Sequence, residues 1–432
     1  MLLALIAATA VVPQGTWIVD ANNGPGTQFT DLPPAVATAA HGDTILVRSG
    51  DYLAFQVSGK ALTIRGAGAS NARVVSSPNA LVSAIQNVPA GSVFFLDGLH
   101  FEPDWRDGLL AAPAALRVSG SSTTVAIADC ELRWQPGGVV AGHALAIDGA
   151  TVLAARSNFF GSDVAGFLAL SDSGGNGIQA VGATLVAIDC HMVGGDHAVS
   201  KHGASRGAAA VSLAGGLASL HACSLRGGNK LGLRSPSDGG HGLELLAAGS
   251  FARIAGSPTD TIEGGAGGLG SGLSIAALDP GAAVVVHGTP TLLPTLPSGQ
   301  PLTLGNVVLG AAPLPRLDIT GVTSAAGEIA IGNPITVQVD GGGAAAPCLA
   351  GVDALPAVST ALAPLTLGEV LLPTASFQIA LVLDGGGRFV HTFSTAAVPA
   401  LVGQPVFSQA AVLDVAGNRI RMSNLGLHLY TN

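Results

Sequence analysis

The stretch CHMVGGDHAVSKHGASR, residues 190–206, gathers side chains that can do chemistry in a chain where they are scarce. Only 10% of the 432 residues are charged. The stretch nevertheless carries one Asp, three His, one Lys and one Arg. Five of the eleven histidines and two of the three lysines of the chain fall between residues 191 and 241. This clustering makes the segment the candidate functional site.

Acidic or amide side chains recur at a fixed interval through the segment. Asp163, Asp196 and Asn229 are equally spaced along the chain, and each follows a Gly-Gly or Gly-Ser pair. Two neighbouring carboxylates beside basic groups can bind Ca²⁺ through their oxygens. They can also be the carboxyl pair of a glycosidase, in which a separation of about 5 Å indicates retention and a wider one inversion. Asp163 and Asp196 are therefore candidates for a calcium site and for glycoside hydrolysis.

The side chains around the acidic pair are candidates for binding a substrate. These candidates are His197, His202, Asn229, Lys230, Arg234 and His241. A second interpretation is architectural, because Asp and Asn after glycine are ordinary turn residues that bond their own backbone. Long loops on one side of a repeat protein also commonly form its binding face. Both interpretations are open from the residues alone.

A repeat with the same interval indicates which elements position these side chains. Ser157, Cys190 and Cys223 are equally spaced, and each is followed four positions later by glycine. Extending the interval predicts a column of small residues: Gly66, Gly98, Cys130, Ser157, Cys190, Cys223 and Gly256. The residues before each member alternate in polarity, which is typical of a strand with one buried face. One such strand per repeat cannot bury its face alone, whereas the stacked coils of a solenoid can.

The segment FTDLPPAVATAAHGDTILVRSGDYLAF predicts a short helix over about residues 34–40, a turn at Gly42 and Asp43, and then a strand. It resembles the N-terminal cap and first turn of right-handed parallel β-helix proteins of the pectin-lyase-like superfamily. The resemblance covers about residues 16–288. It implies an all-β fold, a right-handed parallel β-helix with an N-terminal helical cap. A cap is needed because the end of a solenoid exposes apolar interior and an unpaired strand edge.

The same resemblance adds a catalytic hypothesis. In β-helix polysaccharide lyases, Ca²⁺ neutralises a uronate carboxylate and an Arg or Lys removes the α-proton. This implies Lys201 or Arg206 as the base, with Asp163 and Asp196 as the other catalytic candidates. The chain has no polygalacturonase-like series of NTD, DD, GHG and RIK, and no pectate-lyase-like WIDH or RxPxxR motif. Because the superfamily also holds adhesins and inert scaffolds, the fold leaves the enzyme question open, and the missing motifs favour a non-catalytic protein.

Composition divides the chain into four segments. Residues 1–14 contain a short apolar stretch and the small-x-small sequence ATA, which predict a signal peptide. The β-helix is expected over residues 15–288. Residues 289–316 are rich in proline, which cannot donate to a sheet ladder, and are predicted to be a linker or crossover. Short strands with Gly-rich turns predict a small antiparallel β-sandwich over residues 317–432, similar to C-terminal domains of secreted bacterial repeat proteins.

The cysteines are a test of the repeat. Coils of a parallel sheet lie about 4.8 Å apart, and a disulfide needs Cα atoms about 4.4–6.8 Å apart. A Cys190–Cys223 disulfide is therefore allowed between adjacent coils of an exported chain. A ladder of buried free thiols acting as small apolar residues is the alternative.

Charge and hydropathy exclude several classes of partner. A net charge of −9 offers no electrostatic footprint for nucleic acid, and no apolar run beyond the N-terminus is long enough to span a bilayer. We expect a secreted or cell-surface protein, a non-catalytic scaffold or adhesin whose loops contact extracellular polysaccharide or another cell-surface component. Calcium is the one cofactor suggested. The alternatives are a lyase or glycoside hydrolase acting on acidic polysaccharide, and a self-assembling surface protein.

Overall fold

The computed structural model describes most of the chain between residues 15 and 431. The described ranges are 15–67, 71–75, 82–103, 114–134, 141–165, 174–198, 207–231, 239–267, 271–294, 303–311, 313–321, 328–330, 333–341, 346–353, 366–367, 377–394, 405–414, 419–423 and 426–431. The predicted signal peptide, residues 1–14, lies outside them. Among the described residues, no helix has the length and apolar character needed to cross a membrane.

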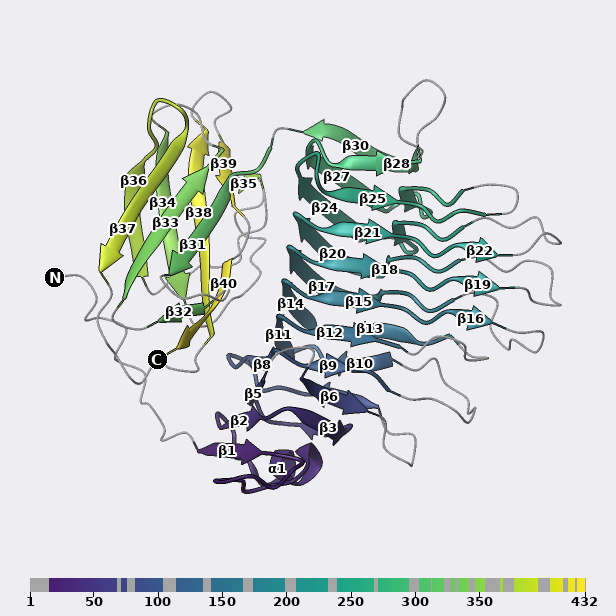
Figure 1. Ribbon diagram of the computed structural model, residues 1–432. Helices are drawn as coiled ribbons and strands as arrows, with labels where there is room; N and C mark the ends of the chain where they lie inside the picture. Colours follow the sequence, from purple (N-terminus) through teal and green to yellow (C-terminus); the bar gives the residue numbers. More distant parts are fainter. Residues whose placement is uncertain are drawn as a thin grey trace. The chain divides into compact units, whose positions relative to one another are not determined.

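The chain folds into two compact units, one of which spans Gly15–Ala311. This unit is the predicted right-handed parallel β-helix, in which long sheets run along the stack of coils (Figure 1). The largest sheet has 18 strands: β1 (Thr16–Val19), β2 (Thr44–Val47), β4 (Gln56–Ser58), β5 (Thr63–Gly66), β7 (Ser83–Gln86), β8 (Phe94–Asp97), β10 (Ala114–Ser119), β11 (Thr124–Ala128), β13 (His143–Asp148), β14 (Thr151–Ala155), β17 (Ile178–Ile188), β20 (Val211–His221), β23 (Leu243–Leu245), β24 (Ser250–Gly256), β26 (Ile275–Ala277), β27 (Ala283–Gly288), β29 (Thr303–Leu304) and β30 (Asn306–Ala311).

Two further sheets complete each coil. The second sheet has nine strands: β3 (Gly50–Leu53), β6 (Ala72–Val75), β9 (His100–Phe101), β12 (Glu131–Arg133), β15 (Asn158–Phe160), β18 (His191–Val193), β21 (Ser224–Arg226), β25 (Thr261–Glu263) and β28 (Thr291–Leu293). The third is short: β16 (Val164–Ala165), β19 (His197–Ala198) and β22 (Lys230–Leu231). All of their pairings are parallel, so equivalent residues of successive repeats become neighbours.

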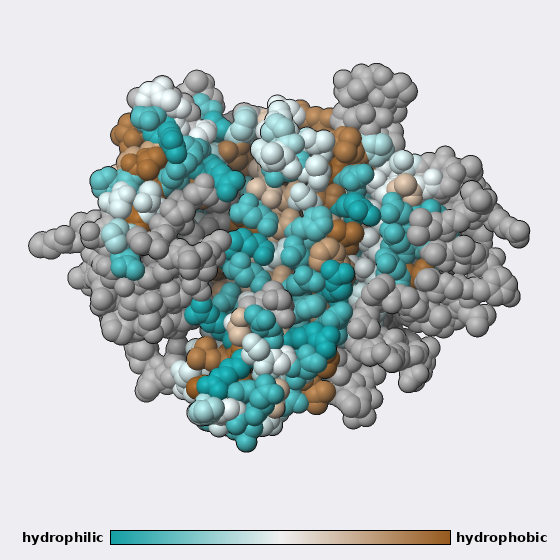
Figure 2. Space-filling view, viewed as in Figure 1, coloured by the Kyte–Doolittle hydropathy of each residue, from teal (hydrophilic) through white to brown (hydrophobic). Residues whose placement is uncertain are grey.

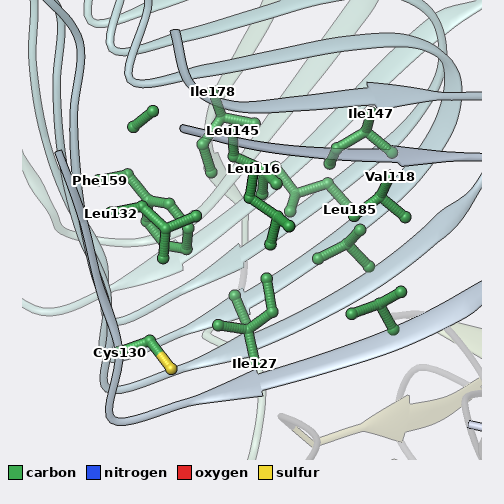
Figure 3. Packing of buried hydrophobic residues seen from close by; sticks show 14 of the residues in the cluster. Leu116, Val118, Ile127, Cys130, Leu132, Leu145, Ile147, Phe159, Ile178 and Leu185 are labelled. Carbon is green, nitrogen blue, oxygen red and sulfur yellow. The ribbon is translucent and has the colours of Figure 1, made fainter. Parts of the chain in front are cut away.

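The core lies between the sheets, where one residue in two points inward. Along β11, Val125 and Ile127 belong to this core, as do Val152 and Ala154 along β14. Figure 3 shows Ile127, Cys130 and Leu132 converging on the same interior. Each coil adds only a few apolar side chains, so the solenoid is stabilised by stacking rather than by any coil alone.

A short helix closes the N-terminal end of this core. Helix α1 runs from Leu32 to Thr38, slightly earlier than predicted, because Asp31 caps it by accepting a hydrogen bond from the Leu32 N–H at 2.7 Å. Leu32, Ala35 and Val36 are buried against the first coils. The helix therefore supplies the apolar cover that an open solenoid end requires.

The predicted column of small residues is confirmed in its central part. Four residues of the column lie directly above one another: Cys130, Ser157, Cys190 and Cys223. Their alignment follows from the strand pairings on both sides of them, β11–β14–β17–β20 before them and β12–β15–β18–β21 after them. The Cys130 N–H also donates to Ser157 Oγ at 3.1 Å.

The ends of the predicted column are wrong by one residue. Asp97 pairs with Ala128, which aligns Gly98 with Asp129 instead of Cys130. His221 pairs with Ala255, which aligns Gly256 with Ala222 instead of Cys223. Gly98 and Asp129 share a corner where φ is positive, 63° and 50°. The glycine meets a backbone requirement there, whereas the cysteines fill a crowded interior position.

The β-helix also extends further than predicted. Strands β28, β29 and β30 pair with β25, β26 and β27, and the unit ends at Ala311. Strands Thr291–Leu293, Thr303–Leu304 and Asn306–Ala311 therefore lie within the predicted linker, residues 289–316, and correct the prediction at these positions. The described prolines Pro290 and Pro294 flank β28 without entering it, so they remove no ladder hydrogen bond.

The C-terminal unit forms the predicted β-sandwich. One sheet contains β31 (Arg316–Gly321), β33 (Pro334–Asp340) and β37 (Arg388–Ser394), all antiparallel. The other contains β32 (Glu328–Ala330), β34 (Pro347–Asp353), β35 (Thr366–Leu367), β36 (Phe377–Val382), β38 (Pro405–Asp414), β39 (Arg419–Met422) and β40 (Gly426–Thr431). Leu317 and Val339 from the first sheet share a core with Cys348 and Ala410 from the second.

Candidate functional site

The three acidic or amide residues predicted at equivalent turns do stack on successive coils. The Asp196 N–H donates to Asp163 Oδ1 at 2.7 Å, and the Asn229 N–H donates to Asp196 Oδ1 at 2.6 Å. Asn229 Oδ1 accepts from the Ala266 N–H at 2.9 Å. Each side chain therefore binds a backbone amide of the coil that follows, so one oxygen of each has a structural role.

A backbone ladder runs beside this polar column. Each coil leaves the solenoid through one strand-like segment and returns through another, and the two segments are joined by N–H to O=C hydrogen bonds. The successive bonds are Ser162 to Gly142, Gly175 to Ser162, Gly195 to Gly175, Ala208 to Gly195, Gly228 to Ala208, Gly240 to Gly228, Gly265 to Gly240 and Gly272 to Gly265. Donor–acceptor distances lie between 2.7 and 3.1 Å. We call this set of bonds the neck ladder; it fixes the roots of four successive loops at the spacing of the coils.

The neck ladder explains the Gly-Gly pairs of the repeat. A Cβ atom at Gly195 would lie 1.7 Å from the Ser162 carbonyl oxygen, and one at Gly228 would lie 1.9 Å from that of Gly195. No side chain fits at these distances. The glycines are needed for close backbone approach, not for flexibility.

The returning segments carry a second polar column. His143 Nδ1 accepts from the Asn176 N–H at 3.0 Å, and Asn176 Oδ1 accepts from the Ala209 N–H at 3.1 Å. Two coils beyond Asn176, His241 Nδ1 accepts from the Leu273 N–H at 3.0 Å. His241, predicted to bind substrate, therefore has one ring nitrogen committed to the backbone. The sequence interpretation missed His143 and Asn176, although the interval of the repeat separates them and was a usable signal.

Strands β19 and β22 place His197 and Lys230 on adjacent coils, with both side chains buried. Lys230 Nζ lies 3.0 Å from His197 Nδ1. Burial lowers the pKa of Lys230. Both side chains are buried, so their role in binding substrate stays a prediction.

Burial has the largest effect on the electrostatics of Asp163. Burial raises its pKa, as does the neighbouring Asp196 carboxylate, while the hydrogen bond from the Asp196 N–H and the positive charges of Arg133 and Arg226 act in the opposite direction. A half-buried carboxyl with a raised pKa is the property expected of a general acid. The arrangement could donate a proton.

Four predicted residues lie outside the described part of the chain: Lys201, His202, Arg206 and Arg234. The lyase hypothesis, which needs Lys201 or Arg206 as the base, therefore stays a prediction. The calcium hypothesis gains no support from the described residues, among which no group of three or more His, Cys, Asp or Glu side chains could hold a metal ion.

The cysteines of the described chain are free thiols. Cys190 and Cys223 stack as the spacing predicted, but no disulfide joins them. Each donates its thiol to a carbonyl two residues earlier, Ile188 and His221, at 3.2 Å. This is the arrangement of the buried-thiol ladder, the alternative interpretation.

A partly exposed strip on the second sheet was missed from the sequence. The Arg133 guanidinium lies 4.3 Å from the centre of the Phe160 ring, and the His191 ring meets Phe160 edge-on at 5.8 Å. The three residues come from β12, β15 and β18. These strands are consecutive in the second sheet. The three residues are of different types, so no residue that recurs with the repeat indicated them in the sequence. In this aromatic strip, Arg133–Phe160–His191, Phe160 precedes Ser162 of the neck ladder by two residues and His191 precedes Gly195 by four.

Comparison with known proteins gives remote similarities only. No protein family model and no curated protein matches the chain. Among solved structures it is similar to the enzymatically active domain of tailspike protein 2 of bacteriophage CBA120, with 10% identity over 89% of this chain and 72% of that one, at a TM-score of 0.26. It is also similar to the A-module of mannuronan C-5 epimerase from Azotobacter vinelandii, with 10% identity over 63% of this chain and 87% of that one, at a TM-score of 0.18. Likenesses at this level say nothing about the activity of this chain.

Proposed function

We propose that the protein is an exported, non-catalytic β-helix scaffold that contacts carbohydrate through the side carrying its loops and the aromatic strip. One observation carries the proposal. Asp163, Asp196 and Asn229, the acidic column on which a reaction centre would depend, each hold a backbone amide of the next coil. Their recurrence follows from the needs of the repeat, without any reaction.

The neck ladder supports a binding role for the loops. It holds the loop roots at a regular spacing set by the coils, about 4.8 Å apart. Repeated loops on a rigid frame form an extended surface suited to a polymer with repeated units. An extracellular polysaccharide is such a polymer.

The aromatic strip supports carbohydrate as the partner. Phe160 offers an apolar ring, while Arg133 and His191 beside it offer hydrogen-bond donors. Sugars present both apolar C–H faces and hydroxyl groups, so an aromatic ring flanked by donors is chemically matched to them.

Glycoside hydrolysis is the second candidate. The raised pKa of Asp163 favours it, because Asp163 would be the acid and Asp196, one coil away, the nucleophile or base. The protonated acid would donate through its second oxygen, since the first accepts the Asp196 N–H. A glycoside hydrolase would release reducing ends from a polysaccharide, whereas a non-catalytic scaffold would not, and this difference can be measured.

A glycan array probed with the full chain tests the proposal, with and without a calcium chelator. We expect binding to a defined set of polysaccharides, reduced by Phe160→Ala. Phe251→Ala is the matched control, because Arg253 lies over the Phe251 ring at 5.3 Å on β24, away from the loop side. Absence of any binding, or equal loss in both variants, would contradict the proposed surface. A signal abolished by chelator would restore the calcium hypothesis.

Export is tested separately by the mature N-terminus. We expect the purified extracellular protein to begin after residue 10, the end of the small-x-small sequence. Retention of Met1 on a protein that stays inside the producing cell would contradict export.

A further inference from the structure

A row of polar and charged side chains leads up to the aromatic strip along the second sheet. Strand pairing places Asp51, Arg73, His100 and Glu131 side by side on β3, β6, β9 and β12. The next residue along each strand belongs to the core, so these four side chains point outward. Figure 2 shows hydrophilic residues over much of the face where Figure 1 draws these strands. The row reaches the strip at β12, which also carries Arg133.

Two arginines hold the carboxylates of this row. Arg73 donates to both oxygens of Asp51, at 2.9 and 2.7 Å, and through Nη1 to Glu102 Oε2 at 3.2 Å. Arg133, the arginine of the aromatic strip, donates through Nε to Glu131 Oε1 at 3.1 Å. Each of the two glutamates therefore has one oxygen that already accepts from an arginine.

His100 lies between these same two oxygens. Its Nε2 is 3.9 Å from Glu102 Oε2 and 3.7 Å from Glu131 Oε1, and both distances are too long for a hydrogen bond. This nitrogen is shielded from solvent and has no hydrogen-bond partner in the described part of the chain. A shielded polar atom without a partner is unfavourable, so a proton on Nε2 that binds either oxygen would stabilise the site.

The charges around His100 are unbalanced while its ring is neutral. The described charged groups that lie around it are Arg73 on β6, Glu102 directly after β9, and Glu131 and Arg133 on β12. Asp51, one strand further away, adds a third carboxylate against the two guanidinium groups. A protonated His100 supplies the positive charge that balances this set. Because the His100, Glu102 and Glu131 side chains are only 17%, 19% and 26% exposed, solvent screens this charge only in part.

We propose that His100 is a pH-sensitive switch that controls Arg133 in the aromatic strip. When His100 is neutral, Glu131 Oε1 accepts from Nε of Arg133 and holds its side chain. When His100 is protonated, Nε2–H binds the same oxygen and displaces Arg133, whose donors become available beside the Phe160 ring. Histidine is the side chain that ordinarily changes charge between pH 5 and 8.

The effect of the switch on binding rests on the proposed carbohydrate function. Sugar hydroxyl groups accept hydrogen bonds, and Arg133 offers them more donors once Glu131 releases it. Affinity for a glycan should therefore rise as the pH decreases from about 7.5 to about 5.5. We expect a rise of about two- to fivefold, the effect of one partly exposed ion pair.

NMR spectroscopy of the full chain, isotopically labelled at arginine and histidine, tests the switch without any carbohydrate. We expect the Arg133 Nε–H signal to shift with the same midpoint as the His100 ring. In His100→Gln, which cannot gain a charge, the shift should disappear. Glu131→Gln should keep Arg133 in its low-pH state at every pH, because a neutral amide holds a guanidinium less tightly than a carboxylate does. An Arg133 signal that does not follow His100 in the wild type would overturn the proposal.

Glycan binding by the same variants at both pH values tests the consequence. His100→Gln should bind like the wild type at the higher pH and should show no change at the lower one. His191→Gln is the matched control, because His191 is the histidine of the strip itself, and it should keep the pH dependence. Dependence that persists in His100→Gln and is lost in His191→Gln would contradict the switch. Circular dichroism establishes that each variant is folded, and His100→Asn replaces His100→Gln if the latter does not fold.

The two measurements separate this proposal from the proposed function. If the Arg133 signal follows His100 but no glycan binds at any pH, the carbohydrate function fails and the switch stands. If glycans bind the wild type equally well at both pH values, the carbohydrate function stands and the proposed control by His100 is overturned.

Discussion

Asp196 donates its backbone N–H to the carboxylate of Asp163, 33 residues earlier in the chain, at 2.7 Å. Asn229 repeats this relationship with Asp196 on the next coil. An amide oxygen and a carboxylate oxygen accept equally well in this position, which explains why both Asp and Asn occur there. The relationship gives the acidic column a structural role that is independent of any chemistry.

Substitution of Asp163 distinguishes this structural role from catalysis. Asp163→Ala removes the acceptor of a partly buried N–H, and we expect the free energy of unfolding to fall by about 1–2 kcal/mol. Asp163→Asn keeps an acceptor oxygen and should cost less than half as much. Chemical denaturation of both variants gives the comparison. Equal losses would contradict the role of Asp163 as a backbone acceptor.

The neck ladder predicts that Gly195 cannot be replaced. In Gly195→Ala the new methyl group meets the Ser162 carbonyl oxygen, so the two segments must separate. We expect destabilisation of about 1–3 kcal/mol or more, as for other overpacked sites. Gly385→Ala is the control, because a Cβ there meets nothing within 4 Å. Thermal unfolding that is unchanged in Gly195→Ala would show that the neck ladder does not hold the loops.

The returning column predicts a dependence of stability on pH. Burial lowers the pKa of His143 to about 4, from an ordinary value of 6.5, with a smaller effect from the charge of Arg117. Since the folded state binds the proton less well than the unfolded chain, this contribution is fully present above pH 6.5 and is lost as the pH falls towards 4. The loss amounts to about 3 kcal/mol at most.

His143→Asn is the variant that checks this. Asparagine already occupies the equivalent position one coil later, where Asn176 Oδ1 accepts the Ala209 N–H. The variant should therefore keep the hydrogen bond. Its free energy of unfolding should fall less than that of the wild type as the pH decreases from 6.5 to 4. Denaturation curves across that interval provide the measurement. If the wild type and His143→Asn lose stability equally over this pH interval, a group other than His143 causes the loss.

The stacked cysteines predict an inert thiol ladder. Burial raises the pKa of Cys130 and of Cys223, and that of Cys348 to about 12. Because the thiolate is the reactive form, alkylation of the native protein near pH 7 should be negligible. Four thiols should react once the protein is unfolded without reductant. If only two thiols react in the unfolded protein, a Cys190–Cys223 disulfide is present instead of the thiol ladder.

The repeat predicted the fold because its interval is a physical property of the coil. Seven small residues suggested one column, and the four central ones do stack. The interpretation failed at Gly98 and Gly256 because small residues occur at two neighbouring positions of the coil. Gly98 lies at a corner with positive φ, which Asp129 and Ala222 also adopt on other coils, whereas Cys and Ser fill the crowded interior position beside that corner. Spacing alone does not separate these two positions.

The functional residues were harder to predict for a related reason. A polar side chain in a turn looks the same in sequence whether it faces solvent or the next coil. Burial of His197 and Lys230 depends on the third sheet, whose strands contain two residues each and leave no periodic pattern. Similarly, proline density suggested a linker at residues 289–316 because sequence does not show that Pro290 and Pro294 flank β28.

The central claim is that Asp163 and Asp196 serve the coil and not a reaction. The most direct measurement is release of reducing ends, or of unsaturated sugars, from each polysaccharide that binds in the array. We predict no turnover by the wild-type protein at any pH between 4 and 8. Turnover that Asp196→Asn abolishes while the variant remains folded would contradict the claim and establish the acidic column as a catalytic centre.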